Sequence, residues 1–450
     1  MNRFLPDYAN AAVPRYTSYP TALQFHELDE QTYRRWLRSL RQQEPLSVYL
    51  HVPFCHQLCW YCGCATEVNR RTENVEAYTR MLEQEIEMVA AQMSPTGGIG
   101  HLHFGGGTPT QLAPVDFRRL FTILDRSFGF TEDAERAVEV DPRRLDPEMV
   151  EAFATSGINR VSLGVQDIDP EVQALINRLQ PLETVMKAVD RLREAGIMRI
   201  SMDMIYGLPG QTEAHVRATA RAVASAGASR VSVFGYAHVP WFRKHQKAID
   251  QTLLPGATDR FKQMLAAADE LQKAGYSNIG FDHFARPDDG LVIARESGRL
   301  RRNFQGYTDD QATTMLGFGS SSIGSLPDGY VQNAASSRDW QAMLAGQQLP
   351  VVRGYSATFE DKLRRRLIEE IMCYGALDAT ATCRDFGADT RLAEEAFAGL
   401  EQLASDGLLT YDRQALTLRA TETGRLYLRN IAACFDPTHI SRAGKHSRAI

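Results

Sequence analysis

Four cysteines lie within one short stretch of the chain. Cys55, Cys59, Cys62 and Cys64 fall within ten residues, directly after an apolar run that predicts a strand. The first three have the spacing C-x3-C-x2-C, which allows one loop to place three thiolates around a metal centre. Three thiolates on a [4Fe–4S] cluster leave one iron without a protein ligand, and a small molecule can bind there.

A zinc site that uses all four cysteines is the main alternative. Structural zinc sites usually take two pairs of ligands separated by a longer loop, and the C-x3-C-x2-C-x-C stretch is crowded for that arrangement. Cys64 follows Cys62 after a single glycine, so it is either an additional ligand, a residue that shapes the loop, or one that faces the substrate. Cys373, Cys383 and Cys434 are expected to be buried thiols.

Polar and glycine-rich motifs accompany the next predicted strands. Consecutive glycines let a bare backbone approach a ligand closely, a carboxylate accepts from amino and hydroxyl groups, and an arginine offers a fork to a carboxylate. Each motif alone has a plain structural alternative, such as a tight turn or a cap. Their placement at successive strand ends favours a cofactor site, and they comprise Gly105-Gly106-Gly107, Glu139, Gln166, Arg178 and Asp203.

Six short runs of β-branched and other apolar residues predict the strands that must position these groups, at 47–52, 101–104, 137–140, 160–165, 199–205 and 230–234. Helical patterns lie between or after them, at 75–92, 184–194 and 261–273. Gly157, Gly196, Gly227 and Gly275 each close a helix just before a strand. This alternation predicts an α/β fold with parallel strands, an open or partial barrel, and chemistry at the carboxyl ends of the strands.

The two ends of the chain differ from the middle. Pro6, Pro14 and Pro20 exclude a long helix near the start, so residues 1–36 are predicted to form an arm, with a helix at 30–43 following. The barrel pattern occupies residues 37–349. Residues 350–450 predict a mostly helical domain, with helices at 359–372 and 391–404 and a hairpin of 408–411 with 415–418, which together look like a winged helix.

The composition excludes several classes of function. The 450 residues are 44% hydrophobic and 23% charged, as in globular proteins. The net charge of −5 argues against a nucleic-acid coat or a membrane-surface binder. No apolar run reaches the roughly 20 residues of a membrane span, and the start has no apolar signal core. We therefore expect a cytoplasmic protein, and a monomer is the simplest state.

The cysteine spacing, with the aromatic Tyr61 just before the third cysteine, resembles that of the radical S-adenosylmethionine (SAM) superfamily. The resemblance implies a partial (β/α)6 barrel, here with an N-terminal arm and a smaller, mostly helical, winged-helix-like C-terminal domain. It also implies that SAM chelates the open iron through its amino and carboxylate groups. An electron from the cluster then breaks the sulfonium C–S bond, giving methionine and a 5′-deoxyadenosyl radical that abstracts a hydrogen atom.

More specific motifs cover essentially the whole chain and resemble the oxygen-independent coproporphyrinogen III oxidases of haem biosynthesis. The resemblance implies oxidative decarboxylation of two propionates of coproporphyrinogen III to vinyl groups, with one SAM consumed for each. It implies two bound SAM molecules, together with an electron donor and an electron acceptor that the motifs do not identify. The motifs include Pro14-Arg15-Tyr16-Thr17-Ser18-Tyr19-Pro20-Thr21, Asn177-Arg178-Leu179-Gln180, Tyr236-Ala237-His238-Val239-Pro240 and Arg302-Asn303-Phe304-Gln305-Gly306-Tyr307-Thr308.

The resemblance also assigns site residues by matching motif. It implies that the cluster ligands are Cys55, Cys59 and Cys62, with Cys64 as a possible additional one. It implies that the first SAM meets Tyr49, Gly106, Glu139, Gln166, Arg178 and Asp203, and that the second meets Gly107, Thr108, Ala237 and Ile323. Tyr61 joins the cofactor-binding set, and Glu139 and Tyr49 are the catalytic candidates.

The implied substrate is a large, flexible tetracarboxylate, so its site should offer cations and aromatic side chains near the barrel mouth. We hypothesise that three residues of the arm and two later arginines contribute: Arg15, Tyr16, Tyr19, Arg301 and Arg302.

Two other interpretations compete with this enzyme. Haem chaperones of the same superfamily look similar across the barrel but generally lack the arm and the cysteine after Cys62-Gly63. A winged-helix regulator that senses iron–sulfur status would bind DNA, which the acidic balance disfavours. The chain departs from the family pattern at Tyr61, where phenylalanine is usual, and at Leu179, where an acid is common, and neither departure touches the cluster.

Overall fold

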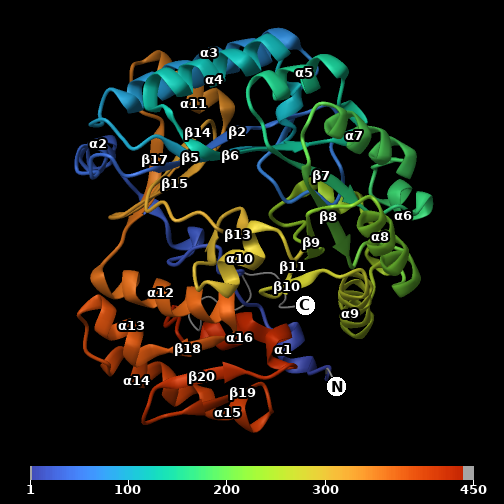
Figure 1. Cartoon of the computed structure of the whole chain (residues 1–450), viewed down its shortest axis with the longest axis vertical. Helices are drawn as coiled ribbons and strands as arrows, with labels where there is room; N and C mark the ends of the chain where they lie inside the picture. Colours follow the sequence, from blue (N-terminus) through green and yellow to red (C-terminus); the bar gives the residue numbers. More distant parts are fainter. Residues whose placement is uncertain (1–2, 439–450) are drawn as a thin grey trace.

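The computed structural model describes residues 3–438 and centres on one large mixed sheet (Figure 1). Six strands lie where the sequence predicts them, and they are adjacent and parallel in chain order. They are β2 (Leu46–Val52), β5 (Ile99–Gly106), β6 (Phe130–Val140), β7 (Arg160–Gln166), β8 (Arg199–Tyr206) and β9 (Arg230–Gly235). Their carboxyl ends therefore meet at one edge, where the cysteine loop and the other predicted motifs begin.

The sheet extends beyond these six strands on both sides. A seventh parallel strand, β14 (Met315–Phe318), pairs with β2. Short antiparallel strands complete the edges: β15 (Ile323–Leu326), β16 (Gly329–Asn333), β17 (Val351–Ser356) and β1 (His26–Glu27) on one side, and β11 (His283–Ala285) and β10 (Ser277–Ile279) on the other. β1 and β10 are the two ends of the strand order, so the sheet is open, which confirms the partial barrel.

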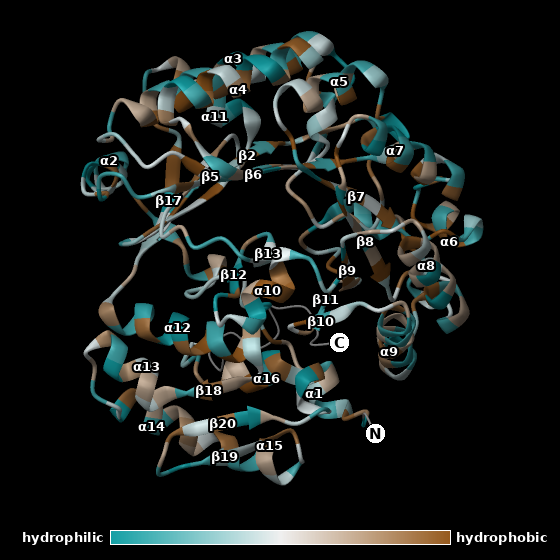
Figure 2. Cartoon of the chain, viewed as in Figure 1, coloured by the Kyte–Doolittle hydropathy of each residue, from teal (hydrophilic) through white to brown (hydrophobic). Residues whose placement is uncertain are grey.

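Helices cover the outer face of the parallel strands (Figure 1). In Figure 2 they carry both hydrophilic and hydrophobic segments, as expected of helices with one face on a core. The four glycines that the sequence places at helix ends have φ values of +70° to +88°, the left-handed conformation that ends a helix without a Cβ clash. The outer helices are α3 (Thr72–Ala90), α4 (Pro114–Phe128), α5 (Pro147–Thr155), α6 (Pro170–Leu175), α7 (Leu182–Glu194), α8 (Glu213–Ser225), α9 (Ala257–Lys273) and α11 (Ser337–Ala345).

The arm and the C-terminal region share one hydrophobic core. The arm contributes Leu5, Ala9, Tyr16 and Tyr19 to it, and Leu5 N donates to Tyr427 Oη (3.0 Å). Within residues 3–29 the only α-helix is the short α1 (Pro6–Asn10), and the following α2 (Glu30–Arg38) ends five residues before the predicted end at residue 43. No helix of residues 3–438 is long and apolar enough to cross a membrane.

The C-terminal region is mostly helical, as predicted. Its hairpin gains a third antiparallel strand, so the sheet order is β18 (Ala376–Asp378), β20 (Thr417–Ala420) and β19 (Leu409–Asp412). The accompanying helices are α12 (Phe359–Tyr374), α13 (Ala379–Phe386), α14 (Arg391–Phe397), α15 (Glu401–Ser405) and α16 (Leu428–Ala433).

Candidate active site

One cavity of about 1310 Å³ gathers every cluster-ligand, cofactor-binding and catalytic residue that the sequence nominates. They come from segments up to 274 residues apart, and most lie at or beyond the carboxyl ends of strands, whereas Tyr49 and Asp203 lie within β2 and β8 and Ile323 begins β15. The residues are Tyr49, Cys55, Cys59, Tyr61, Cys62, Cys64, Gly106, Gly107, Thr108, Glu139, Gln166, Arg178, Asp203, Ala237 and Ile323.

The cysteine loop, residues 55–66, is held from several sides. Its two ends pair as the short strands β3 (Phe54–Cys55) and β4 (Glu67–Val68). Asn177 Nδ2 donates to the carbonyl of Leu58 (2.9 Å). Three side chains after β9 bind successive carbonyl oxygens of the loop: Arg243 binds Gly63 (2.9 Å), His245 binds Cys62 (2.8 Å) and Gln246 binds Tyr61 (3.0 Å). The loop is therefore fixed by its backbone, which leaves the thiols directed at the cavity.

Cationic and hydroxyl groups surround the cysteine sulfurs. Arg178 Nη1 donates to Cys59 Sγ (3.5 Å), and the Cys55 Sγ lies 3.6 Å from Thr108 Oγ1. A hydrogen bond from Cys64 lowers the pKa of the Cys62 thiol against the effect of burial, and the same pairing raises the pKa of Cys64. Burial raises the pKa of Cys55 to about 11. At neutral pH the Cys55 thiol therefore stays protonated unless a cationic centre binds there. Such a centre would favour the thiolate, because metals bind cysteine in its thiolate form.

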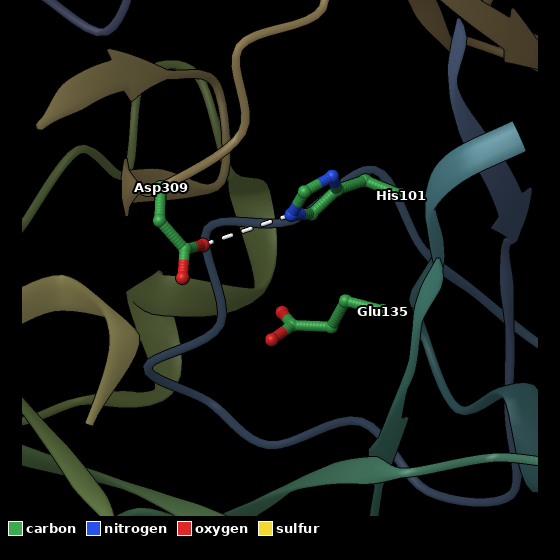
Figure 3. A group of neighbouring side chains, drawn as sticks. All are labelled: His101, Glu135 and Asp309. Atoms are coloured by element: carbon green, nitrogen blue, oxygen red, sulfur yellow. Dashed lines mark ion pairs between the residues drawn. The ribbon is translucent and has the colours of Figure 1, made fainter. Parts of the chain in front are cut away.

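The separation of the sulfurs fits a cluster better than a single ion. Within residues 3–438, the only three side chains whose ligand atoms all lie within 4.8 Å of one another are His101, Glu135 and Asp309 (Figure 3). At least one pair of the three cysteine sulfurs is therefore more than 4.8 Å apart, which is wider than ligands that converge on one zinc ion, whose bonds to sulfur are about 2.3 Å long. They leave room for a larger inorganic group between them.

Tyr49 and His51 form a hydrogen-bonded chain to the cysteine loop. His51 Nε2 lies 2.8 Å from the carbonyl of Ala65, which only accepts, so Nε2 carries the proton. His51 Nδ1 is then an acceptor, and the Tyr49 hydroxyl donates to it (3.0 Å). The ring also touches the glycine motif: Gly106 has φ +116°, and a Cβ there would lie 2.7 Å from His51 Cε1. His51 therefore links the strand β2, the cysteine loop and the glycine motif.

Glu139 is oriented by two groups of β5. Its Oε1 lies 3.0 Å from His103 Nε2, and its Oε2 accepts from the backbone N of Gly106 (3.3 Å). Tyr49 stacks on His103 with ring centroids 5.9 Å apart. The Glu139 side chain remains 41% exposed, so its carboxylate keeps lone pairs free for a ligand in the cavity.

The other predicted polar residues lie along β7 and β8. Arg178 Nη2 donates to the carbonyl of Gly164 (2.7 Å), and Asp203 Oδ2 accepts from Ser162 (3.2 Å). Burial raises the pKa of Asp203. Gln166 ends β7 with a φ of +69°, a strained value for a residue with a side chain, and such strain is often found at functional sites.

The hypothesised substrate residues divide into two groups. Arg15 lines the cavity and donates to the carbonyl of Gly235 (3.2 Å). The other four do not line it, because their side chains are engaged elsewhere. Three of them join the arm to the rest of the chain: Tyr16 donates to Asp436 (3.1 Å), Tyr19 is buried in the C-terminal core, and Arg302 Nη2 donates to Arg15 O (3.3 Å). Arg301 pairs with Glu369 (2.9 Å) in the C-terminal region.

Sequence analysis missed several cavity residues. His51 and His103 are hidden within strands, where a lone histidine gives no signal. Phe304 and Gln305 line the cavity from the hairpin of β12 (Arg301–Asn303) and β13 (Gly306–Thr308), which are too short to predict. The run from 302 to 308 carried part of the resemblance, and it is the signal that could have found them.

A network of ion pairs lies at the amino-end side of the cavity, and Figure 3 shows three of its side chains, His101, Glu135 and Asp309. His101 Nε2 lies 3.6 Å from Asp309, and Arg160 Nε lies 2.9 Å from Glu135. Arg230 approaches both Glu135 (3.8 Å) and Asp309 (3.7 Å). Burial opposes protonation of His101, but the hydrogen bond with Asp309 and the neighbouring carboxylates outweigh it and raise its pKa. With two guanidinium groups on these carboxylates, the network is already neutralised and offers no site for a cation.

Comparison with known proteins decides the family. Residues 49–223 match the family model of the radical SAM superfamily. The chain is 46% identical to the oxygen-independent coproporphyrinogen III oxidase of Bradyrhizobium diazoefficiens over 98% of both chains, and 40% identical to that of Paracoccus denitrificans over 98% of this chain and 97% of the relative. The chain belongs to the oxygen-independent coproporphyrinogen III oxidase family.

A solved structure from the oxygen-independent coproporphyrinogen III oxidase family supports the same conclusion. The coproporphyrinogen III oxidase of Escherichia coli, described as a radical SAM enzyme, is 38% identical to this chain, with a TM-score of 0.89. The match covers 94% of this chain and 97% of the Escherichia coli chain. Membership confirms the resemblance drawn from the cysteine loop and the arm. It also confirms the α/β radical SAM fold and implies a [4Fe–4S] cluster and SAM as cofactors.

Proposed function

We propose that this protein is a radical SAM enzyme that converts coproporphyrinogen III to protoporphyrinogen IX by oxidative decarboxylation of two propionate side chains. The observation that carries the proposal is the single cavity in which the cysteine loop meets the polar residues of successive strand ends. The names of its relatives agree with this activity.

We assign Cys55, Cys59 and Cys62 as the ligands of the [4Fe–4S] cluster. A [4Fe–4S] cluster held by these three residues would supply the electron for reductive cleavage of SAM, and with it the radical chemistry needed to remove a hydrogen atom from a propionate. Arg178 holds Cys59 by its hydrogen bond and stabilises the thiolate. Cys64 donates to Cys62 and is exposed, which supports a role in shaping the loop or facing the substrate more than a role as a fourth ligand.

The first SAM would contact the residues nearest the cysteine loop. Glu139 is the leading candidate for its amino group or hydroxyls, since its carboxylate is fixed by Gly106 and faces the cavity. Tyr49 contributes its ring, because its hydroxyl is already committed to His51. Both are our catalytic candidates. The proposed contacts of the first SAM are Tyr49, Tyr61, Gly106, Glu139, Gln166, Arg178 and Asp203.

A second SAM is supported by the size of the cavity. Small-molecule sites usually measure about 300–1,000 Å³, and this cavity of about 1310 Å³ is larger. Gly107, Thr108, Ala237 and Ile323 line the same space and are the proposed contacts. Arg15 is the candidate from the arm for a substrate carboxylate, because its guanidinium reaches the cavity.

We also propose how the chain is organised. It divides into an arm (1–36), a barrel (37–349) and a C-terminal domain (350–450), with the sheet completed by β17 from the last part. We propose that it acts as a cytoplasmic monomer that needs an electron donor for the cluster, an electron acceptor after loss of CO2, and no nucleic acid.

The test is anaerobic reconstitution with iron and sulfide, followed by SAM, a reductant and coproporphyrinogen III. We expect the enzyme to form protoporphyrinogen IX and to release two molecules of methionine for each molecule of protoporphyrinogen IX. Cys59→Ser should abolish product, whereas Cys434→Ser, which changes a thiol outside the cavity, should not. Tight haem binding without decarboxylation would instead identify a chaperone, and one methionine per product would remove the second SAM.

A further inference from the structure

Two of the most exposed aromatic side chains lie beside the cysteine loop. Trp241 and Phe242 are each 69% exposed, in the segment that follows β9. Phe242 also lines the mouth of the cavity, whereas Trp241 lies outside it. Large apolar side chains that are neighbours on a surface indicate a contact with another molecule, since covering them with a partner removes apolar surface from water and lowers the free energy.

The same segment is bonded directly to the part of the loop that contains a proposed cluster ligand. Arg243 binds the carbonyl of Gly63, and His245 binds the carbonyl of Cys62 itself. Trp241 is therefore joined to a proposed ligand of the cluster through four residues of chain and one hydrogen bond, the one from His245 to Cys62.

Positive charge without a carboxylate partner lies in both segments that contact the cysteine loop. The segments 56–71 and 239–248 carry five Lys and Arg and one acid, Glu67, in a chain whose net charge is −5. No carboxylate of residues 3–438 lies within 4.0 Å of any of the five cations. Arg70 also binds the carbonyl of His56 in the loop (3.5 Å), so positive charge flanks the loop at both ends. The five are Arg70, Arg71, Arg243, Lys244 and Lys247.

We propose that Trp241, Lys244 and Lys247 form the docking surface for a small acidic protein that carries one electron to the cluster. The inference rests on the proposed function, which requires that electron. The carrier loses one electron and the cluster gains it, and no atom is transferred. Complementary charge would steer the carrier to the surface, and the exposed tryptophan would hold it there.

The substrate is the other candidate occupant, since its carboxylates are also negative. The geometry favours the carrier, because Trp241, Lys244 and Lys247 do not line the cavity that would hold the tetrapyrrole. Their side chains can therefore be changed without touching the proposed SAM or substrate contacts, which allows the two occupants to be separated by experiment.

The experiment measures 5′-deoxyadenosine release by the reconstituted holoenzyme with SAM and coproporphyrinogen III. One assay uses an acidic plant-type [2Fe–2S] ferredoxin that NADPH and its reductase keep reduced, and the other assay uses dithionite as the reductant. For Lys244→Glu/Lys247→Glu we expect the apparent KM for ferredoxin to rise about ten-fold, while the dithionite-driven rate stays unchanged. Trp241→Ser should raise the same KM, and added salt should weaken the wild type more than the charge-reversed variant.

The matched control reverses two exposed charges elsewhere, Arg338→Glu in α11 and Arg413→Glu in the β19–β20 turn. This control should change neither the KM for ferredoxin nor the dithionite-driven rate. The proposal is overturned if ferredoxin cannot drive the wild type although dithionite does, or if the lysine variant keeps its KM for ferredoxin. It is also overturned if that variant loses the dithionite-driven rate as well, because the surface would then serve the substrate. Failure of the wild type with both reductants would refute the proposed function instead.

Discussion

The chain from Tyr49 through His51 to Ala65 allows a sharp test of how the site is held together. Tyr49→Phe removes one hydrogen bond, the one from the Tyr49 hydroxyl to His51 Nδ1. His51→Leu removes that bond and also the one from Nε2 to the Ala65 carbonyl. Because the Tyr49–His51 bond is lost in both variants, their effects should not add.

The expected magnitudes follow from the number of bonds. A hydrogen bond of this kind contributes about 1 kcal/mol to stability, and Tyr49, His51 and Ala65 all line the cavity, so water can reach the groups left behind. Tyr49→Phe should lower the free energy of unfolding by about 1 kcal/mol and His51→Leu by about 2 kcal/mol. The double variant should lose about 2 kcal/mol, which gives a coupling of about 1 kcal/mol.

Urea unfolding of the cluster-free protein measures the stability, and a second assay measures the loop. Only His51→Leu frees Ala65, so only that variant should release iron to a chelator faster, by about five-fold for a bond of about 1 kcal/mol. If the double variant loses the sum of the two single effects, the proposed tautomer and the shared bond are wrong. Equal iron release from both single variants would show that His51 does not anchor the loop.

Three further predictions concern the surroundings of the site. Gly106→Ala should abolish SAM binding measured by calorimetry, because a Cβ would meet His51 and φ is +116°; unchanged affinity would contradict this. Burial raises the pKa of Glu85 from 4.5 to about 7. Between these two pH values the folded protein keeps a proton on Glu85 that the unfolded protein releases. The free energy of unfolding should therefore fall by up to about 3 kcal/mol between pH 5 and pH 8. Glu85→Gln should flatten that fall, and an equal fall in the variant would exclude Glu85 as its source. Deleting residues 1–21 should lower the melting temperature, because the arm supplies Tyr16 and Tyr19 to the C-terminal core; an unchanged melting temperature would show that the arm is only loosely attached.

The central fold could be predicted because its signals are local and repeated. Each of the six predicted parallel strands is long enough to show an apolar run, and each glycine joint has a physical reason in its left-handed φ. The edges of the sheet could not be predicted, since β1 and β10 have only two and three residues and are stabilised by pairing with distant strands. Strand pairing of this kind depends on tertiary context more than on composition.

The residues of the site also fall into a group that could be predicted from the sequence and a group that could not. The cysteines and the residues at strand ends could be predicted, because motif spacing and strand direction bring them to one edge. The orientation of Glu139 by His103 and the link through His51 could not, since each depends on a partner chosen by the fold. Tyr16 was expected near the substrate but donates to Asp436, a contact 420 positions away that no local pattern reveals.

The central claim is that three thiolates leave one iron of a [4Fe–4S] cluster open and that SAM binds there. The most direct measurement is the electron paramagnetic resonance spectrum of the reduced, reconstituted protein before and after addition of SAM. The account predicts about four irons and four sulfides per chain and a spectrum that changes when SAM is added. Tightly bound zinc in oxygen-free preparations, or a fully loaded cluster whose spectrum SAM leaves unchanged, would contradict it.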